Sequence, residues 1–89
     1  MISHTTERFR KALKKLPTQI QQQAREAYKQ FLQNPYHPSL HFKQVHAIEP
    51  IYSVRIGLHY RAVGVQDDDE MLWFWIGIHS EYERLLASL

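Results

Sequence analysis

Two periodicities of apolar residues divide the chain into a helical first half and a sheet-forming second half. In residues 5–16 the apolar positions follow the i, i+3, i+4, i+7 spacing of one helix face, with Thr5 or Thr6 available as N-cap. These positions are Phe9, Ala12, Leu13 and Leu16. Pro17 suits the first turn of a second helix, whose apolar stripe runs to residue 32 and stops before Asn34-Pro35. The pattern predicts an N-terminal helix hairpin.

After a loop at residues 34–39, which contains two prolines, the apolar period changes to two. Leu40 and Phe42 begin this alternation, and residues 51–79 are predicted to form three consecutive antiparallel strands. The turns are expected near Gly57 and at the acidic run 67–70, and a short closing helix from Ser80. The expected fold class is α+β, with the N-terminal helix hairpin packed on a small antiparallel β-sheet and a short C-terminal helix.

Composition limits the size and the setting of this fold. A chain of 89 residues with 44% hydrophobic content suits one domain, residues 1–89, with one modest core. The sequence has no cysteine, so disulfides and thiolate metal sites are excluded and a reducing compartment is expected. No apolar run reaches the roughly 18 to 20 residues that span a bilayer. We expect a soluble, cytoplasmic protein without membrane contact, whose net charge of +2 permits binding to a polyanion.

Three side chains of the predicted strands suggest a chemical site. Alternation places Arg55 on the face opposite the apolar side of its strand, and it places Trp73, Trp75, Gly77 and His79 together on one face. Guanidinium groups bind phosphate and an imidazole transfers protons near neutral pH, so Arg55, Arg61 and His79 suit phosphodiester cleavage without a metal. The alternative is that both arginines are solvated strand residues paired with the acidic turn.

The residues around this set resemble those of a known family. Three segments, in this order, are similar to the RelE/ParE superfamily of bacterial toxin–antitoxin toxins: Tyr52-Ser53-Val54-Arg55-Ile56-Gly57, Tyr60-Arg61-Ala62-Val63 and Trp75-Ile76-Gly77-Ile78-His79-Ser80-Glu81-Tyr82. Upstream, the Leu13–Pro17 and Asn34–Leu40 segments resemble the helix hairpin and loop of that family. The resemblance therefore covers nearly the whole chain.

The resemblance implies a toxin of the RelE/YafQ-like branch. Such a toxin is a ribosome-dependent, metal-independent mRNA endoribonuclease that inhibits translation and is neutralised by a cognate antitoxin, with no cofactor. Arg55 matches a strand position that is often basic, Arg61 matches the arginine of a Tyr-Arg motif, and His79 matches the catalytic histidine of Gly-x-His-Ser. These three are the predicted catalytic residues. Ser53 stands where RelE-like members have a second strand lysine, and Tyr82 represents their C-terminal tyrosine.

Other residues are predicted to help bind RNA. Lys14 and Lys15 belong to a basic helix surface that can follow RNA phosphates, although a solvated helix face explains them equally well. Lys43 and Tyr82 are further RNA-binding candidates near the predicted strands. Trp73 and Trp75 can stack on bases or pack against the last helix. The loop and strand histidines His37, His41 and His46 lack a recognised metal-ligand spacing, so no metal site is expected.

Two other functions stay open at the level of sequence. One is a non-enzymatic, ParE-like toxin that inhibits DNA gyrase through a protein interface. The other is a degenerate orphan toxin domain that only binds an antitoxin. Retention of Arg55, Arg61 and His79 counts against the gyrase inhibitor, because ParE-like members generally lack the nuclease residues.

Overall fold

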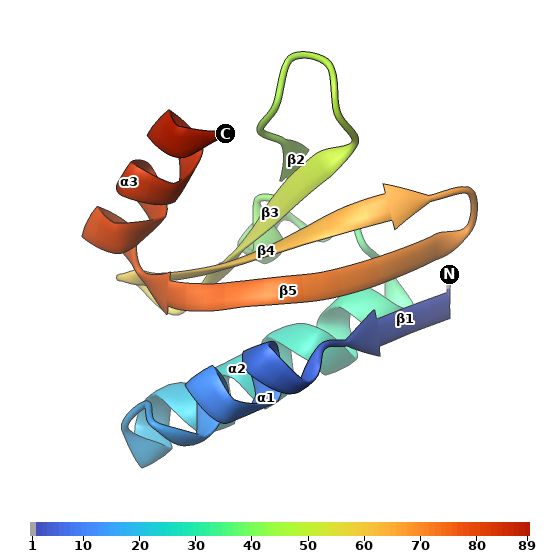
Figure 1. Cartoon of the computed structure of the whole chain (residues 1–89). Helices are drawn as coiled ribbons and strands as arrows, with labels where there is room; N and C mark the ends of the chain where they lie inside the picture. The colour runs from blue at the N-terminus through green and yellow to red at the C-terminus, as the bar shows by residue number, and fades with distance from the viewer. Residues whose placement is uncertain (1) are drawn as a thin grey trace.

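A computed structural model describes residues 2–89 and shows a five-stranded sheet between two helical layers (Figure 1). The sheet order is β1-β5-β4-β3-β2. In chain order the elements are β1 (Ile2–Thr5), α1 (Glu7–Lys14), α2 (Thr18–Gln33), the 3-10 turn η1 (Pro38–Leu40), β2 (Lys43–Gln44), β3 (Ile51–Ile56), β4 (Tyr60–Asp67), β5 (Glu70–Ile78) and α3 (His79–Ser88). No helix within residues 2–89 has the length and apolar content needed to cross a membrane.

The described part of the chain begins with a strand, so the prediction that an N-terminal helix hairpin opens the fold is wrong. Strand β1 pairs with β5 in parallel, from Ile2 opposite Glu70 to Thr5 opposite Trp73, and the sheet is therefore not purely antiparallel. The predicted meander of β3, β4 and β5 is confirmed as antiparallel. The α+β class is confirmed together with the two consecutive helices and the closing helix.

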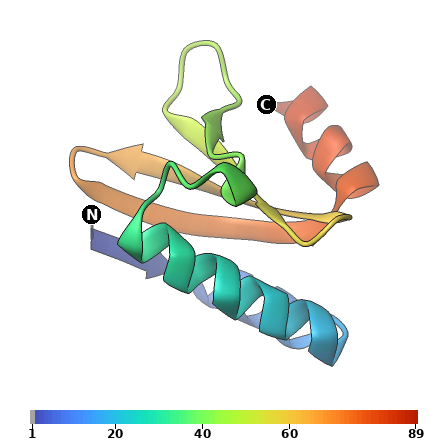
Figure 2. The same ribbon diagram turned by 180° about the vertical axis from the view of Figure 1, so that it is seen from behind.

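Helices α1 and α2 lie side by side on one face of the sheet (Figures 1 and 2). Thr6 is the N-cap of α1 and its side chain accepts a hydrogen bond from the backbone N–H of Phe9 at 3.0 Å, as expected for a threonine cap. Pro17 occupies the N-cap of α2. Phe31 of α2 is 2% exposed and meets Trp73 of β5 edge to face, with ring centres 5.2 Å apart. The main core lies between these helices and the sheet.

A β-bulge in β5 changes which residues share a face. Val63 pairs with Trp75 but the next residue, Gly64, pairs with Trp73, so Phe74 is an extra residue in β5. Trp73 packs on the α2 side, whereas the Trp75 ring lies 6.4 Å from the ring of Tyr82 in α3. The prediction that both tryptophans share one face is wrong for this reason. Packing against the last helix holds for Trp75 alone.

The loop before the meander contains less strand than the alternation predicted. Leu40 belongs to η1 and is 1% exposed, and His41 has a left-handed φ of 47° that interrupts any extended run. Strand β2 therefore has two residues, which pair with Tyr52 and Ser53 of β3. Because β2 is so short, the rest of β3 has an open edge beside α2.

Candidate functional site

The sheet register brings the two predicted arginines together. Arg55 of β3 is the direct partner of Arg61 of β4, and Arg61 is the direct partner of Gly77 of β5. Directly opposed residues of antiparallel strands project from the same face, and two like charges in that position repel each other. Neither guanidinium forms an ion pair within residues 2–89. Arg55 and Arg61, called the arginine row below, therefore concentrate positive charge, and a bound anion would reduce the repulsion between them.

Each guanidinium is oriented by one backbone carbonyl. Arg61 Nη1 donates to the carbonyl oxygen of Tyr60 at 2.8 Å, and Arg55 Nε donates to that of Gly57 at 3.0 Å. The guanidinium carbon of Arg61 lies 6.0 Å from the centre of the Tyr82 ring. These contacts leave other N–H groups of both forks available, and guanidinium forks bind phosphate through parallel hydrogen bonds.

His79 joins this face from a helix, not from a strand. Strand β5 ends at Ile78 and His79 is the first residue of α3, which corrects the prediction that the meander carries it. The backbone N–H of His79 donates to the carbonyl oxygen of His59 at 2.8 Å, which fixes the start of α3 beside the β3–β4 turn. Its Nε2 lies 2.9 Å from Glu83 Oε1, and its ring centre is 5.8 Å from that of Tyr82. Arg61 and His79 are thus neighbours of the same tyrosine ring.

Tyr82 anchors α3 to the sheet. It is 5% exposed, and its hydroxyl donates a 3.0 Å hydrogen bond to Oγ of Ser53, which is 1% exposed. A ring buried in this way offers little surface to a base, and the RNA contact of Tyr82 stays a prediction. Ser53, a departure from the family pattern, is the partner that sequence reasoning missed.

The predicted lysines divide between the two sides of the sheet. Lys43 pairs directly with Ser53, so it shares the face of the arginine row and is exposed at its edge. Lys14 and Lys15 lie at the end of α1, in the helical layer that covers the opposite face (Figure 1). The structure therefore brings Lys43 to the face of Arg61 and His79 and leaves Lys14 and Lys15 on the other side.

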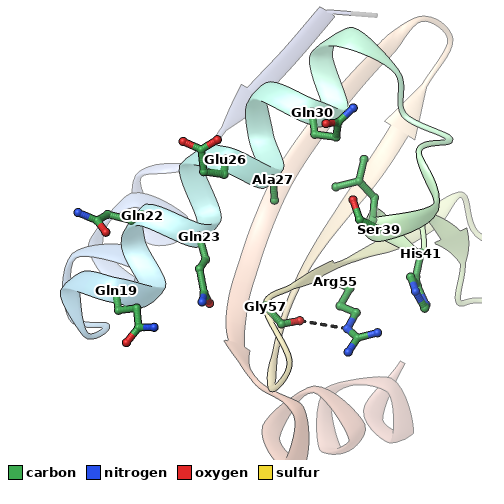
Figure 3. A pocket seen from close by; sticks show the side chains of 11 residues that line it. Gln19, Gln22, Gln23, Glu26, Ala27, Gln30, Ser39, His41, Arg55 and Gly57 are labelled. Atoms are coloured by element: carbon green, nitrogen blue, oxygen red, sulfur yellow. Dashed lines mark hydrogen bonds between the residues drawn. The ribbon is translucent and has the colours of Figure 1, made fainter.

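A polar groove of about 760 Å³ borders the arginine row. It runs between α2, η1 and the open edge of β3, and Arg55 lies at its border (Figure 3). Four glutamines of α2 line it: Gln19, Gln22, Gln23 and Gln30. Sequence reasoning missed these residues because it followed the apolar stripe of the helix. The spacing of the glutamines along the neighbouring face was the signal that could have found them.

Within residues 2–89 no group of three or more His, Cys, Asp or Glu side chains is arranged to hold a metal ion. Two of the loop histidines instead accept hydrogen bonds from backbone N–H groups. His37 Nδ1 accepts from Ser39 at 3.2 Å, and His46 Nδ1 accepts from Glu49 at 2.8 Å. These rings stabilise local turns.

The fold, a sheet between a helix pair and a single helix, is similar to that of small RelE-like toxins. A chain of the RelB–RelE antitoxin–toxin complex from Methanococcus jannaschii superposes with a TM-score of 0.73 at 16% identity, over 91% of this chain and 95% of that one. YafQ from Escherichia coli superposes with a TM-score of 0.72 at 8% identity, over 90% of this chain and 94% of that one. The isolated RelE toxin of E. coli superposes with a TM-score of 0.67 at 17% identity, over 99% of this chain and 98% of that one.

The sequence itself gives the family. A family model of the ParE-like toxin domain matches residues 18–84, which is most of the chain, so the protein belongs to the ParE-like toxin domain family. The resemblance to the RelE/ParE superfamily of toxin–antitoxin toxins is thereby confirmed. No curated protein shows significant sequence similarity to the chain.

Proposed function

We propose that this toxin is a ribosome-dependent, metal-independent mRNA endoribonuclease that inhibits translation in the cytoplasm. The observation that carries the proposal is the direct pairing of Arg55 with Arg61, with no ion-pair partner within residues 2–89, beside a helix that begins with His79. Two unneutralised guanidiniums on adjacent strands favour a doubly contacted phosphate. The RelE and YafQ structures support the fold of such an enzyme.

In the proposed reaction the ribose 2′-OH attacks the adjacent phosphorus and the bond to the 5′-oxygen of the next nucleotide breaks. Arg55 and Arg61 stabilise the charge that develops on the phosphorane oxygens. Two protons move, one from the 2′-OH and one to the leaving 5′-oxygen. His79 transfers one of them as general acid or base and water exchanges the other; positioned acid–base catalysis typically contributes about 10²–10⁴-fold. Since Nε2 of His79 faces Glu83, the proton moves through Nδ1 while Glu83 orients the ring.

The test is cleavage of mRNA by purified protein on programmed ribosomes. His79→Ala should reduce cleavage by at least about 100-fold, while the circular dichroism spectrum and melting temperature stay close to those of the unchanged protein. The substitution is tolerated because His79 is exposed and alanine is the best helix former.

A matched control is His4→Ala. His4 also faces a glutamate, with Nε2 3.9 Å from Glu70 Oε1, but it lies on β1 at the other edge of the sheet. This variant should cleave like the unchanged protein. Undiminished cleavage by His79→Ala, or equal loss in both variants, would remove His79 from the chemistry.

We further propose that a cognate antitoxin covers the basic face. The M. jannaschii and E. coli RelE proteins were crystallised as complexes with RelB antitoxins, which supports a partner of this kind. Cleavage on ribosomes should stop when the antitoxin is added in equal amount. A complex in which the toxin still cleaves at full rate would contradict this arrangement.

The match to a ParE-like family model favours one second candidate, a non-enzymatic inhibitor of DNA gyrase. This function needs a protein interface and no phosphate chemistry, so it predicts that Arg61→Ala and His79→Ala inhibit supercoiling as well as the unchanged protein does. Gyrase supercoiling measured with these variants separates the two candidates.

A further inference from the structure

The polar groove beside Arg55 exists because the sheet edge is left open there. Strand β2 pairs with Tyr52 and Ser53 and then stops, so β3 from Val54 onward has no strand neighbour on that side. Helix α2 faces this open edge across the groove (Figure 3). The groove has a volume of about 760 Å³ and is open to solvent.

The helical wall of the groove is a row of amides that contains one carboxylate, Glu26. Gln19, Gln23 and Gln30 lie at i, i+4 and i+11, which places them along one face of α2, and Gln22 lies on the adjacent face. Within residues 2–89 none of these four side chains makes a hydrogen bond. The neighbouring Gln21 differs, because its amide donates to the carbonyl oxygens of Lys14 and Leu16. The groove glutamines therefore keep both donors and acceptors for a ligand.

The cation of the lining lies on the sheet side of the groove, whereas its carboxylate lies on α2 among the glutamines. Arg55 and His41 lie across from the glutamines, and Glu26 is the one carboxylate among the lining residues (Figure 3). A ligand that suits this lining has an uncharged, hydrogen-bonding body for the amides and a single anionic group for Arg55. A nucleotide has this division of chemistry, because its base edges carry donors and acceptors and its phosphate carries the charge.

Gly57 allows the amide row to reach the sheet. Its φ of +57° belongs to the left-handed region, and a Cβ at this position would overlap Oε1 of Gln23. The carbonyl of the same residue orients Arg55. One glycine thus allows Gln23, within the amide row, to lie against the turn whose carbonyl orients Arg55.

We propose that this groove binds the nucleotide of the substrate RNA that neighbours the cleaved phosphate. The base lies against the glutamine row, where the amide of Gln23 reads its edge, and its phosphate reaches Arg55. The inference rests on the proposed nuclease function, since Arg55 serves both the cleaved phosphate and the groove. It assigns base selection to residues of α2.

The test measures binding without cleavage. Four trinucleotides that differ only in the central base carry 2′-O-methyl groups, which remove the attacking hydroxyl, and each is titrated into ¹⁵N-labelled full-length protein. The side-chain amide signals of the groove glutamines should shift, and affinity should differ between the best and the worst base by about tenfold, the size of one bidentate amide contact. The amide signal of Gln21 should not move.

Two variants complete the experiment. The double variant Gln23→Ala, Gln30→Ala should bind all four trinucleotides with equal affinity, and the control Gln33→Ala, an exposed residue of α2 outside the groove, should keep the difference. Equal affinity for all bases in the unchanged protein would overturn the inference, as would a difference that survives the double variant. Groove signals that respond only to an antitoxin peptide would also overturn it and assign a protein interface.

Failure of the inference and failure of the nuclease proposal are distinguishable. If the protein discriminates the bases but does not cut mRNA on ribosomes, the cleavage proposal is wrong and the groove is still a nucleotide site. If the protein cuts mRNA but does not discriminate the bases, the cleavage proposal stands and the assignment of the groove as a nucleotide site is wrong.

Discussion

The hydrogen bond between Tyr82 and Ser53 should carry a measurable share of the stability. Both residues are more than nine-tenths buried, so the removal of one hydroxyl leaves the other without its partner. An unsatisfied buried hydroxyl costs about 1–3 kcal/mol. We therefore expect Tyr82→Phe and Ser53→Ala each to lower the free energy of unfolding by about 1–2 kcal/mol, or the melting temperature by about 4–8 °C per kcal/mol in a domain of this size.

The double variant provides the decisive comparison. Removal of both hydroxyls leaves no orphaned group, so Tyr82→Phe with Ser53→Ala should cost less than the sum of the single variants, by about 1 kcal/mol. Urea unfolding of the four proteins, followed by circular dichroism, measures this coupling. Because the bond anchors the helix that begins with His79, the single variants should also lower mRNA cleavage, but less than His79→Ala does. Additive stability losses would show that the two hydroxyls are not paired.

Three further predictions follow from particular contacts. Thr6→Ala removes the N-cap of α1 and should lower the free energy of unfolding by about 1 kcal/mol in urea denaturation, whereas Thr6→Ser should restore it. Phe31→Ala removes a ring that contacts both Trp73 and Phe42 at 5.2 Å and should cost about 3–5 kcal/mol, enough to leave the chain partly unfolded by circular dichroism. Arg61→Lys keeps the charge but loses the fork, so mRNA cleavage on ribosomes should fall while the melting temperature changes little; an unchanged rate would contradict bidentate phosphate binding.

Much of the architecture was predictable because it follows from the local periodicity of apolar residues. The stripe that includes Phe9 and Leu13 indicated α1, and one of the two threonines proposed as its cap, Thr6, is the N-cap. Alternation from Tyr52 to Ile56 predicted β3, and the acidic run near Asp68 marked a turn. The acidic turn lies at one end of the β4–β5 pair and Arg61 lies near the other end. This separation keeps the carboxylates away from the proposed phosphate site.

The features that sequence missed depend on tertiary contacts. Residues 2–5 form a strand because β5 offers an open edge for parallel pairing, which no pattern within four residues reveals. The extra residue Phe74 places Trp73 and Trp75 on opposite faces of the sheet. Strand alternation cannot predict such a bulge. The pairing of Arg55 with Arg61 likewise depends on strand register, which is set by the turn at residues 57–59.

The most direct measurement for the central claim is the chemistry of the cut ends. Purified protein is incubated with ribosomes carrying an mRNA of known sequence, and the ends of the fragments are identified. Attack by the 2′-OH under Arg55, Arg61 and His79 predicts a cut within the A-site codon that leaves a 2′,3′-cyclic phosphate and a 5′-hydroxyl. A 5′-phosphate end, or intact mRNA together with inhibited gyrase, would contradict the account.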